Sequence, residues 1–236
     1  MIRKLLKILG ILIALLVVGF ITIYAVYNEE LPEGRTGADA DALAEKMLST
    51  LHYEKFKDTR YLEWSFNGGA HQYKWDKEKH KVDVAWDDYL VNLDLISKGS
   101  SVVSKNGERL MDIESEAIIK KAVDKFNNDS FWLVAPYKVF DAGVKRSIVP
   151  LPDGTNGLLV TYTTGGSTPG DSYLWMMQPN GFPKSFKMWV NIIPIGGIEA
   201  TWDDWAVMES GVFLPKSHEM GPIKLLMGDI KGYNEE

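Results

Sequence analysis

The sequence predicts an α+β protein: a large curved antiparallel sheet, in the form of an incomplete β-barrel, with helices packed on one face and one amino-terminal transmembrane helix. Three observations support this prediction. Many short segments alternate apolar and polar residues and follow one another after short turns, as antiparallel strands do. Two segments have apolar residues at helical spacing. Residues 8–27 contain no charged side chain. An uncharged, apolar stretch of this length can cross a bilayer as a helix.

The amino-terminal segment divides into a basic tail, residues 1–7, and the apolar run, residues 8–27. As a helix the run is ~30 Å long, which matches the hydrocarbon core of a bilayer. Tyr24 and Tyr27 lie at its outer end, where aromatic rings favour the headgroup region. Basic residues precede the run and acidic residues follow it. The positive-inside rule therefore predicts a single-pass inner-membrane protein with a cytoplasmic amino terminus and a periplasmic main domain.

A cleaved signal peptide is the alternative interpretation of the same run. The run is long for a signal peptide, and its end, Ile23-Tyr24-Ala25, lacks a small-x-small cleavage site. Either interpretation exports the domain. Residues 28–37, which include Pro and Gly, are predicted to be a linker, and residues 38–236 the main domain.

The charge balance limits the possible partners. Removing the three basic residues of the tail from the 26 in the chain leaves 23 against 32 acidic ones, a net charge of −9. An acidic domain repels polyphosphate, so a nucleic-acid partner is not expected. The chain has no cysteine, which excludes disulfides, thiolate metal sites and a cysteine nucleophile.

A helix is predicted from Asp39 or Asp41 to Leu51, because leucine and methionine recur on one face and an aspartate can cap the start. The period then changes to two. The predicted strands of the first half are Leu62–Phe66, Gln72–Trp75, Val82–Trp86, Val91–Leu95 and Val102–Val103. Asn106-Gly107 is a strong hairpin signal.

A second helix is predicted over Ile113–Phe126, with glutamates near its start and lysines towards its end, as the helix dipole favours. Asn127-Asn128-Asp129 is expected to end it. The predicted strands of the second half are Val139–Val149, Leu158–Thr164, Ser172–Met177 and Ser185–Ile193. Pro179-Asn180-Gly181 is predicted to join the last two as a hairpin.

Familiar catalytic motifs are incomplete. Gly165-Gly166-Ser167-Thr168-Pro169 approaches the hydrolase elbow G-x-S-x-G but fails at its last position and leads into a loop. His218-Glu219 begins like a zinc helix, yet Gly221-Pro222 blocks the helix and the second histidine is missing. We therefore predict that the protein is not an enzyme, and we expect no cofactor.

Other polar residues give no clear site. His71 and His80 can meet across a hairpin, but no third metal ligand has sensible spacing. Asp87-Asp88 and Asp203-Asp204 are neighbours in strand-like segments, so their side chains point to opposite faces and do not form an acid–base pair. We predict no metal site.

Eight tryptophans are spread over most of the predicted strands. They indicate either a large, well-packed core or an apolar cavity beneath the curved sheet.

Three short motifs resemble those of exported proteins with the LolA/LolB-like, lipoprotein-localisation fold. NDSFWLVAPYKVFDAG places Asp129, Phe131, Trp132, Leu133, Pro136, Tyr137, Lys138, Asp141 and Gly143 in the first pattern. Thr168–Asp171 matches a T-P-G-D turn, and Thr201, Trp202 and Trp205 match a T-W-x-x-W pattern. The resemblance implies an incomplete antiparallel barrel, closed by helices, whose hydrophobic cavity accepts acyl chains or similar ligands. Members of this fold act as carriers that shuttle between membranes. A domain with a retained membrane anchor departs from that pattern, because a fixed domain cannot shuttle.

Two functions follow as hypotheses. The first is a membrane-anchored, periplasm-facing domain that binds a lipid, a lipoprotein acyl chain or another apolar ligand, in lipoprotein handling or envelope sensing. Its candidate cavity-wall residues are Trp86, Trp132, Tyr137, Tyr173, Trp175 and Trp189. The alternative is a structural or protein-interaction module with a filled core that docks an envelope protein partner.

Overall fold

The computed structural model describes residues 2–111 and 113–235 and has four α-helices among them. They are α1 (Ile2–Tyr27), α2 (Ala38–Thr50), α3 (Tyr53–Asp58) and α4 (Ile113–Val134). A short 3₁₀ turn, η3 (Ala135–Lys138), continues from α4. Two further 3₁₀ turns, η1 (Asn67–Gly69) and η2 (Lys98–Ser100), lie between strands.

The first half of the chain builds an open seven-stranded antiparallel sheet. Its spatial order is β16-β1-β2-β3-β4-β5-β6, so a strand from the carboxyl-terminal end of the chain forms one edge of the sheet. The strands are β1 (Tyr61–Phe66), β2 (His71–Asp76), β3 (Lys81–Trp86), β4 (Tyr89–Asp94), β5 (Val102–Lys105), β6 (Glu108–Arg109) and β16 (Lys231–Tyr233).

The second half builds a separate five-stranded sheet of order β11-β10-β9-β8-β7. Its strands are β7 (Val144–Pro150), β8 (Asn156–Tyr162), β9 (Ser172–Met177), β10 (Pro183–Trp189) and β11 (Ile198–Thr201). Two separate two-stranded sheets follow in the chain. They pair β12 (Ala206–Val207) with β13 (Phe213–Leu214), and β14 (Ser217–Met220) with β15 (Ile223–Leu226). The α+β class with open antiparallel sheets is thus confirmed.

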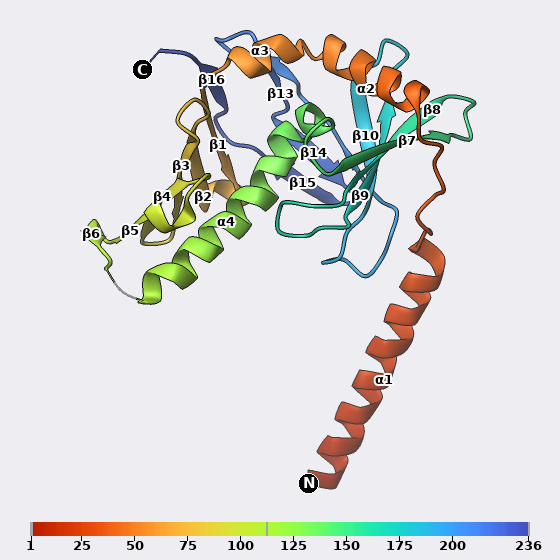
Figure 1. Ribbon diagram of the computed structural model, residues 1–236. Coiled ribbons are helices and arrows are strands. Elements are labelled where there is room, and N and C mark those ends of the chain that lie inside the picture. Colours follow the sequence, from red (N-terminus) through yellow and green to blue (C-terminus); the bar gives the residue numbers. More distant parts are fainter. Residues whose placement is uncertain (1, 112, 236) are drawn as a thin grey trace.

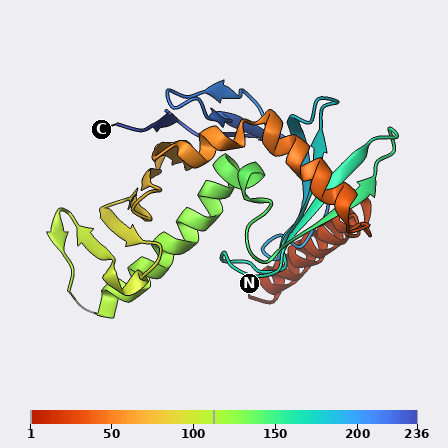
Figure 2. The same cartoon turned by 45° about the horizontal axis from the view of Figure 1, so that its top comes forward.

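Helix α4 crosses the middle of the domain between the two sheets, while α2 and α3 run along one side (Figure 1, Figure 2). Helix α4 packs against β4 and β5, and α2 packs against β7 and β8. The buried apolar side chains form one main cluster that includes Trp64 and Val84 from one sheet and Trp175 and Phe186 from the other. The two sheets therefore share a core through α4.

Helix α1 projects away from the domain as a separate rod (Figure 1). Residues Arg3–Tyr27 are long and apolar enough to cross a membrane, and the apolar window is not buried by the rest of the described chain. An apolar helix without protein cover is the pattern that a lipid environment accommodates.

The second predicted helix is longer in the structure than the sequence indicates. The sequence predicts a stop at Asn127-Asn128-Asp129, but α4 continues to Val134. Asparagine and aspartate disfavour helix interiors only weakly, and tertiary contacts override such a preference. The buried Asp129 is hydrogen-bonded to His71 and Tyr73 of β2, and Leu133 and Val134 are buried in the core.

The structure also differs from the predicted elements at a strand start and at a short helix, and it agrees at one hairpin. The strand predicted from Val139 begins only at Val144, because η3 and a turn at Gly143 (φ 78°) precede it. The short helix α3 was missed, since six residues carry too little periodicity to be recognised. The hairpin at Asn106-Gly107 is confirmed: both residues have positive φ between β5 and β6, as a tight hairpin requires.

The segment predicted as a linker, residues 28–37, lies along the five-stranded sheet. Arg35 and Ile148 exchange two backbone hydrogen bonds, of 2.9 and 2.8 Å. Glu29 is bound to residues 187–196 as well. The connection between α1 and the domain is therefore attached to the sheet over much of its length.

Candidate functional site

Three of the six predicted wall residues meet in an aromatic cluster between α4 and the five-stranded sheet. Trp132 comes from α4, and Tyr173 and Trp175 come from one face of β9. Phe131 and Phe186 fill the space between them, with ring centroids 4.3 Å apart for Phe131–Tyr173 and 5.7 Å for Trp132–Phe186. Alternation along β9 places Tyr173 and Trp175 on the same side.

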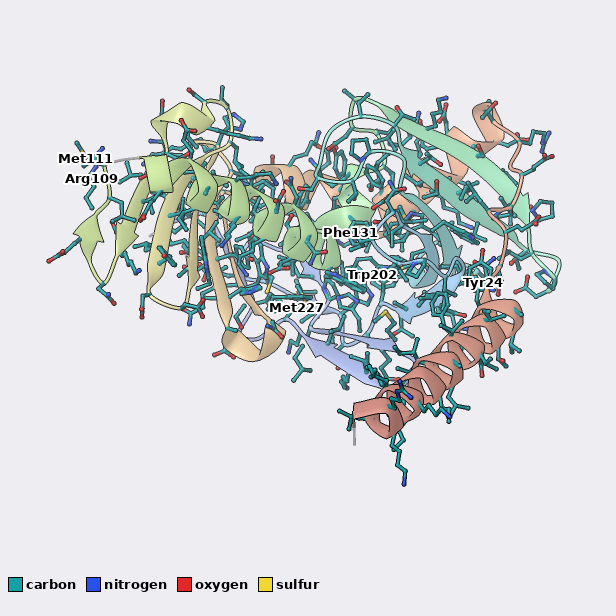
Figure 3. All side chains as sticks on the ribbon, turned by 90° about the horizontal axis from the view of Figure 1, so that it is seen from below. Tyr24, Arg109, Met111, Phe131, Trp202 and Met227 are labelled. Carbon is teal, nitrogen blue, oxygen red and sulfur yellow. The ribbon has the colours of Figure 1, made fainter. Side chains whose placement is uncertain are left out.

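The cluster continues into the segment after β11 and into β14. Trp202 stacks on Trp175 at 5.4 Å, and His218 stands edge-on to Trp202 at 4.8 Å. Phe131 and Trp202 lie close together in the middle of the molecule (Figure 3). We call the set Phe131, Trp132, Tyr173, Trp175, Phe186, Trp202 and His218 the aromatic cluster.

Several polar atoms of this region are buried without a hydrogen-bond partner in the described part of the chain. They include the indole nitrogens of Trp175, Trp202 and Trp205. Trp205 adjoins the cluster, 5.7 Å from Trp202. A buried donor without an acceptor costs about 1–3 kcal/mol, and native structures keep few of them. The indole nitrogens of Trp64 and Trp75, on β1 and β2 of the seven-stranded sheet, lack a partner within the described chain as well, so the property extends beyond the aromatic cluster.

His218 is fully buried at the edge of the cluster. Its Nδ1 lies 2.8 Å from the carbonyl of Thr201, so Nδ1 carries the proton and donates to that oxygen. The other nitrogen, Nε2, makes no hydrogen bond of normal geometry. Burial lowers the pKa of His218, and the carbonyls of Thr201 and Trp132 oppose this only in part.

The structure places the other three predicted residues elsewhere. Tyr137 stacks on Phe56 at 4.2 Å, and its hydroxyl donates to the carbonyls of Leu51 and Phe213. Trp86 lies on the seven-stranded sheet and stacks on Tyr89 at 5.5 Å. Trp189 lies at the end of β10, beside the segment that follows α1.

The two most clearly formed hollows of the described residues are open depressions on the surface. One of about 290 Å³ lies between Asn28, Leu31 and the Trp189 region. The other, of about 330 Å³, lies beside β12 and β16. No residue of the aromatic cluster lines either hollow. Ser172, which precedes Tyr173 on β9, lines the first.

A second polar group links α4 to the seven-stranded sheet. The Asp129 carboxylate, 2% exposed, lies 2.7 Å from Nδ1 of His71. It also accepts a hydrogen bond of 2.5 Å from the Tyr73 hydroxyl. Nζ of Lys125 lies 2.5 Å from Nε2 of His71 and faces the ring of Trp86. Burial and the adjacent carboxylate raise the pKa of Tyr73.

This Asp–His pair is not arranged for general-base catalysis. A catalytic histidine needs one nitrogen free to reach the proton that it removes. Here both nitrogens of His71 are engaged, one by Asp129 and one by Lys125. The group joins β2 to α4 and fixes where the helix lies.

Ser167 and His71, which belong to the incomplete motifs of the sequence, make structural contacts. Ser167 donates to the Asp124 carboxylate at 2.8 Å and accepts from Asn127 at 3.0 Å, which holds the glycine-rich loop against α4. His71 pairs with Trp86 at one end of the β2–β3 hairpin, whereas His80 lies in the turn at the other end. Among residues 2–111 and 113–235, no three side chains that could bind a metal gather in one place.

Sequence reasoning did not find the partners of Asp129 or of His218. Asp129 and His71 are 58 residues apart, and no local spacing relates them. The T-W-x-x-W motif is a signal for Trp202 and Trp205, but neither is among the predicted wall residues. His218 was recognised only as an incomplete zinc motif.

The fold and the site describe an α+β protein with two open antiparallel sheets around an aromatic cluster and one apolar amino-terminal helix. No family model matches the sequence, and no curated protein matches it. Among solved structures the chain is similar to a DUF1329 family protein from Desulfovibrio piger, with 10% identity and a TM-score of 0.38. The match covers 82% of this chain and 92% of that one. A likeness of this degree carries no argument about function.

Proposed function

We propose that the protein is a membrane-anchored, periplasm-facing domain that binds a lipid or lipoprotein acyl chain at the aromatic cluster. Helix α4 would move away from the five-stranded sheet to admit the chain. Removing apolar ligand surface from water supplies about 25 cal/mol per Å². No bond is made or broken in this function.

The observation that carries the proposal is the gathering of three unpartnered indole nitrogens, those of Trp175, Trp202 and Trp205, on rings that contact one another. The two other indoles of this kind among the described residues, Trp64 and Trp75, lie on the seven-stranded sheet. An acyl ligand has an apolar body and ester or amide carbonyls at its head. The carbonyl oxygens supply the acceptors that the indoles lack, while the rings surround the chain. A purely hydrocarbon interior would leave the same donors unsatisfied.

The test begins with the full chain purified and exchanged into nanodiscs of one synthetic phospholipid. Native mass spectrometry is expected to detect a retained acyl lipid of a different mass. A brominated fatty acid is expected to quench tryptophan fluorescence, and Trp202→Phe should lower the quenched amplitude. Trp64→Phe is the matched control for position, since Trp64 is equally buried and its indole nitrogen equally lacks a partner, but it lies on the other sheet. Absence of a retained lipid, with equal quenching in both variants, would refute the proposal.

A second candidate is an interaction module of the cell envelope with a filled core. The continuity of the main buried cluster and the open, superficial nature of the two clearest hollows favour it. It predicts no retained lipid and an envelope protein recovered by crosslinking in intact cells. The mass measurement above distinguishes the two candidates.

A further inference from the structure

The residues that follow α1 are fixed to the domain by a set of short contacts. The amide of Glu29 donates to the carbonyl of Gly196 at 3.0 Å, and the amide of Gly196 donates to the Asn28 side chain at 2.9 Å. The indole of Trp189 donates to the Glu29 carbonyl at 2.8 Å, and Lys187 pairs with the Glu29 carboxylate at 2.5 Å. Since the Asn28 amide still bonds to Tyr24, no free spacer separates α1 from these contacts.

Two glycines make this close approach possible. A Cβ on Gly196 would lie 2.7 Å from the Glu29 carbonyl oxygen and 2.4 Å from the Trp189 ring. A Cβ on Gly197, where φ is +82°, would lie 2.6 Å from Cβ of Glu29. Only glycine fits where one backbone comes this close to another. The glycine pair is therefore part of the joint between helix and domain.

The connection between β10 and β11, residues 190–197, starts from a second fixed point. The amide of Asn191 donates to the buried Asp171 carboxylate at 2.9 Å, and the Asn191 side chain donates to Pro169 at 3.1 Å. The T-P-G-D turn thus holds one end of the connection, and Asn28 and Glu29 hold the other. Between these points the chain reads Ile-Ile-Pro-Ile, and Ile192 is 68% exposed.

We propose that residues 190–197 form a bilayer-contacting loop that seats the domain on the outer surface of the membrane. The inference rests on the anchor in the proposed function but not on acyl-chain binding. If residues 8–27 span the hydrocarbon core, Asn28 lies at its boundary. Gly196 is bonded to Asn28, so the loop lies at the same level.

The chemistry of the loop fits lipid better than another kind of partner. Residues 190–197 carry no charge, so apolar burial in the interface drives the contact, not attraction to anionic lipid. Tyr24 and Tyr27 lie in the last turn of α1 and Trp189 bonds to Glu29 just after it, and tyrosine and tryptophan favour the headgroup region. In Figure 1 the connection after β10 lies on the side of the domain from which α1 leaves.

The absence of cysteine allows a direct test with single labels. Ile192→Cys in the full chain is labelled with an environment-sensitive fluorophore in phosphatidylcholine nanodiscs that contain lipids spin-labelled near the headgroup. Ile96→Cys is the matched control, an isoleucine 76% exposed in the connection after β4. Interfacial insertion predicts at least about threefold stronger quenching at position 192 than at position 96.

A third label, Val17→Cys, reports the anchor with lipids spin-labelled at mid-chain. Strong quenching at position 17 together with equal, weak quenching at positions 192 and 96 overturns the seating while leaving the anchor intact. Absence of quenching at position 17 overturns both. Acyl-chain binding is read separately from the Trp202→Phe comparison, so its failure does not affect this result.

Discussion

Asp129 is the buried charge on which the position of α4 depends. Its carboxylate accepts from His71 and Tyr73, both on β2. Asp129→Ala leaves the buried Tyr73 hydroxyl and the partly buried His71 ring without their acceptor, and we expect the free energy of unfolding to fall by about 2–4 kcal/mol. Urea denaturation followed by circular dichroism measures the loss.

The control for Asp129 is Asp88→Ala, an exposed aspartate in the turn between β3 and β4. A change of no more than about 0.5 kcal/mol is expected there, as for most surface substitutions. Equal effects of the two substitutions would contradict the role assigned to the Asp129 group.

His218 should make stability depend on pH. Its pKa is lowered in the folded protein by burial, whereas the pKa of a histidine in an unfolded chain is ~6.5. Below that value the unfolded chain binds more protons than the folded one, so stability falls as the pH decreases from 7.5 to 5 and does not change on this account above 7.5. The slope from one group cannot exceed about 1.4 kcal/mol per pH unit.

The measurement compares urea midpoints at pH 7.5 and 5 for the wild type, His218→Phe and His80→Asn. The loss between the two pH values is expected to be smaller in His218→Phe. His80 is exposed in a turn, where asparagine tolerates the positive φ of 53°, and its variant should keep the wild-type difference. An unchanged difference in His218→Phe would contradict the prediction.

At the scale of elements, the joint between α1 and the five-stranded sheet should depend on Gly197. Gly197→Ala drives a Cβ into the side chain of Glu29, so the substitution should release residues 28–35 from the sheet. Cleavage by a glutamate-specific protease at Glu29, Glu30 or Glu33 should then rise severalfold, because proteases cut chain that leaves its contacts. Limited proteolysis of the full chain in nanodiscs measures the rate.

Gly154→Ala is the matched control for the joint. Gly154 has the same φ of 82°, but a Cβ there meets open space. The two substitutions therefore carry the same backbone strain and differ in the clash. Protease-sensitive linkers in both variants, or in neither, would contradict the role of Gly197.

At the scale of the whole molecule, the two sheets should unfold together. One cluster of buried side chains reaches from Trp64 on β1 through Phe126 on α4 to Trp175 on β9. Because the core is shared, unfolding of one half alone would expose apolar surface of the other half to water. This cost favours a single unfolding transition.

Fluorine NMR of fluorotryptophan-labelled protein tests this, since the eight tryptophans sample both sheets. All resonances are expected to lose their native intensity over the same range of urea. Earlier loss of the Trp64 and Trp75 signals than of the Trp175 and Trp202 signals would show two independent units.

The amino-acid order was enough for features that rest on neighbouring residues. The apolar run before Asn28, the alternation of the β strands, the hairpin at Asn106-Gly107 and the α+β class all follow from local spacing and turn chemistry. These properties depend on residues within a few positions of each other, so the pattern carries them.

Contacts between residues far apart in the chain depend on the tertiary structure and could not be predicted from the sequence. Asn127-Asn128-Asp129 looks like a helix end, yet α4 continues because His71 and Tyr73 bind Asp129 from β2. The division of the strands into two sheets and the attachment of Glu29 to Gly196 likewise join segments far apart in the chain. Local propensities are worth less than about 1 kcal/mol per residue, so burial and hydrogen bonds across such distances override them.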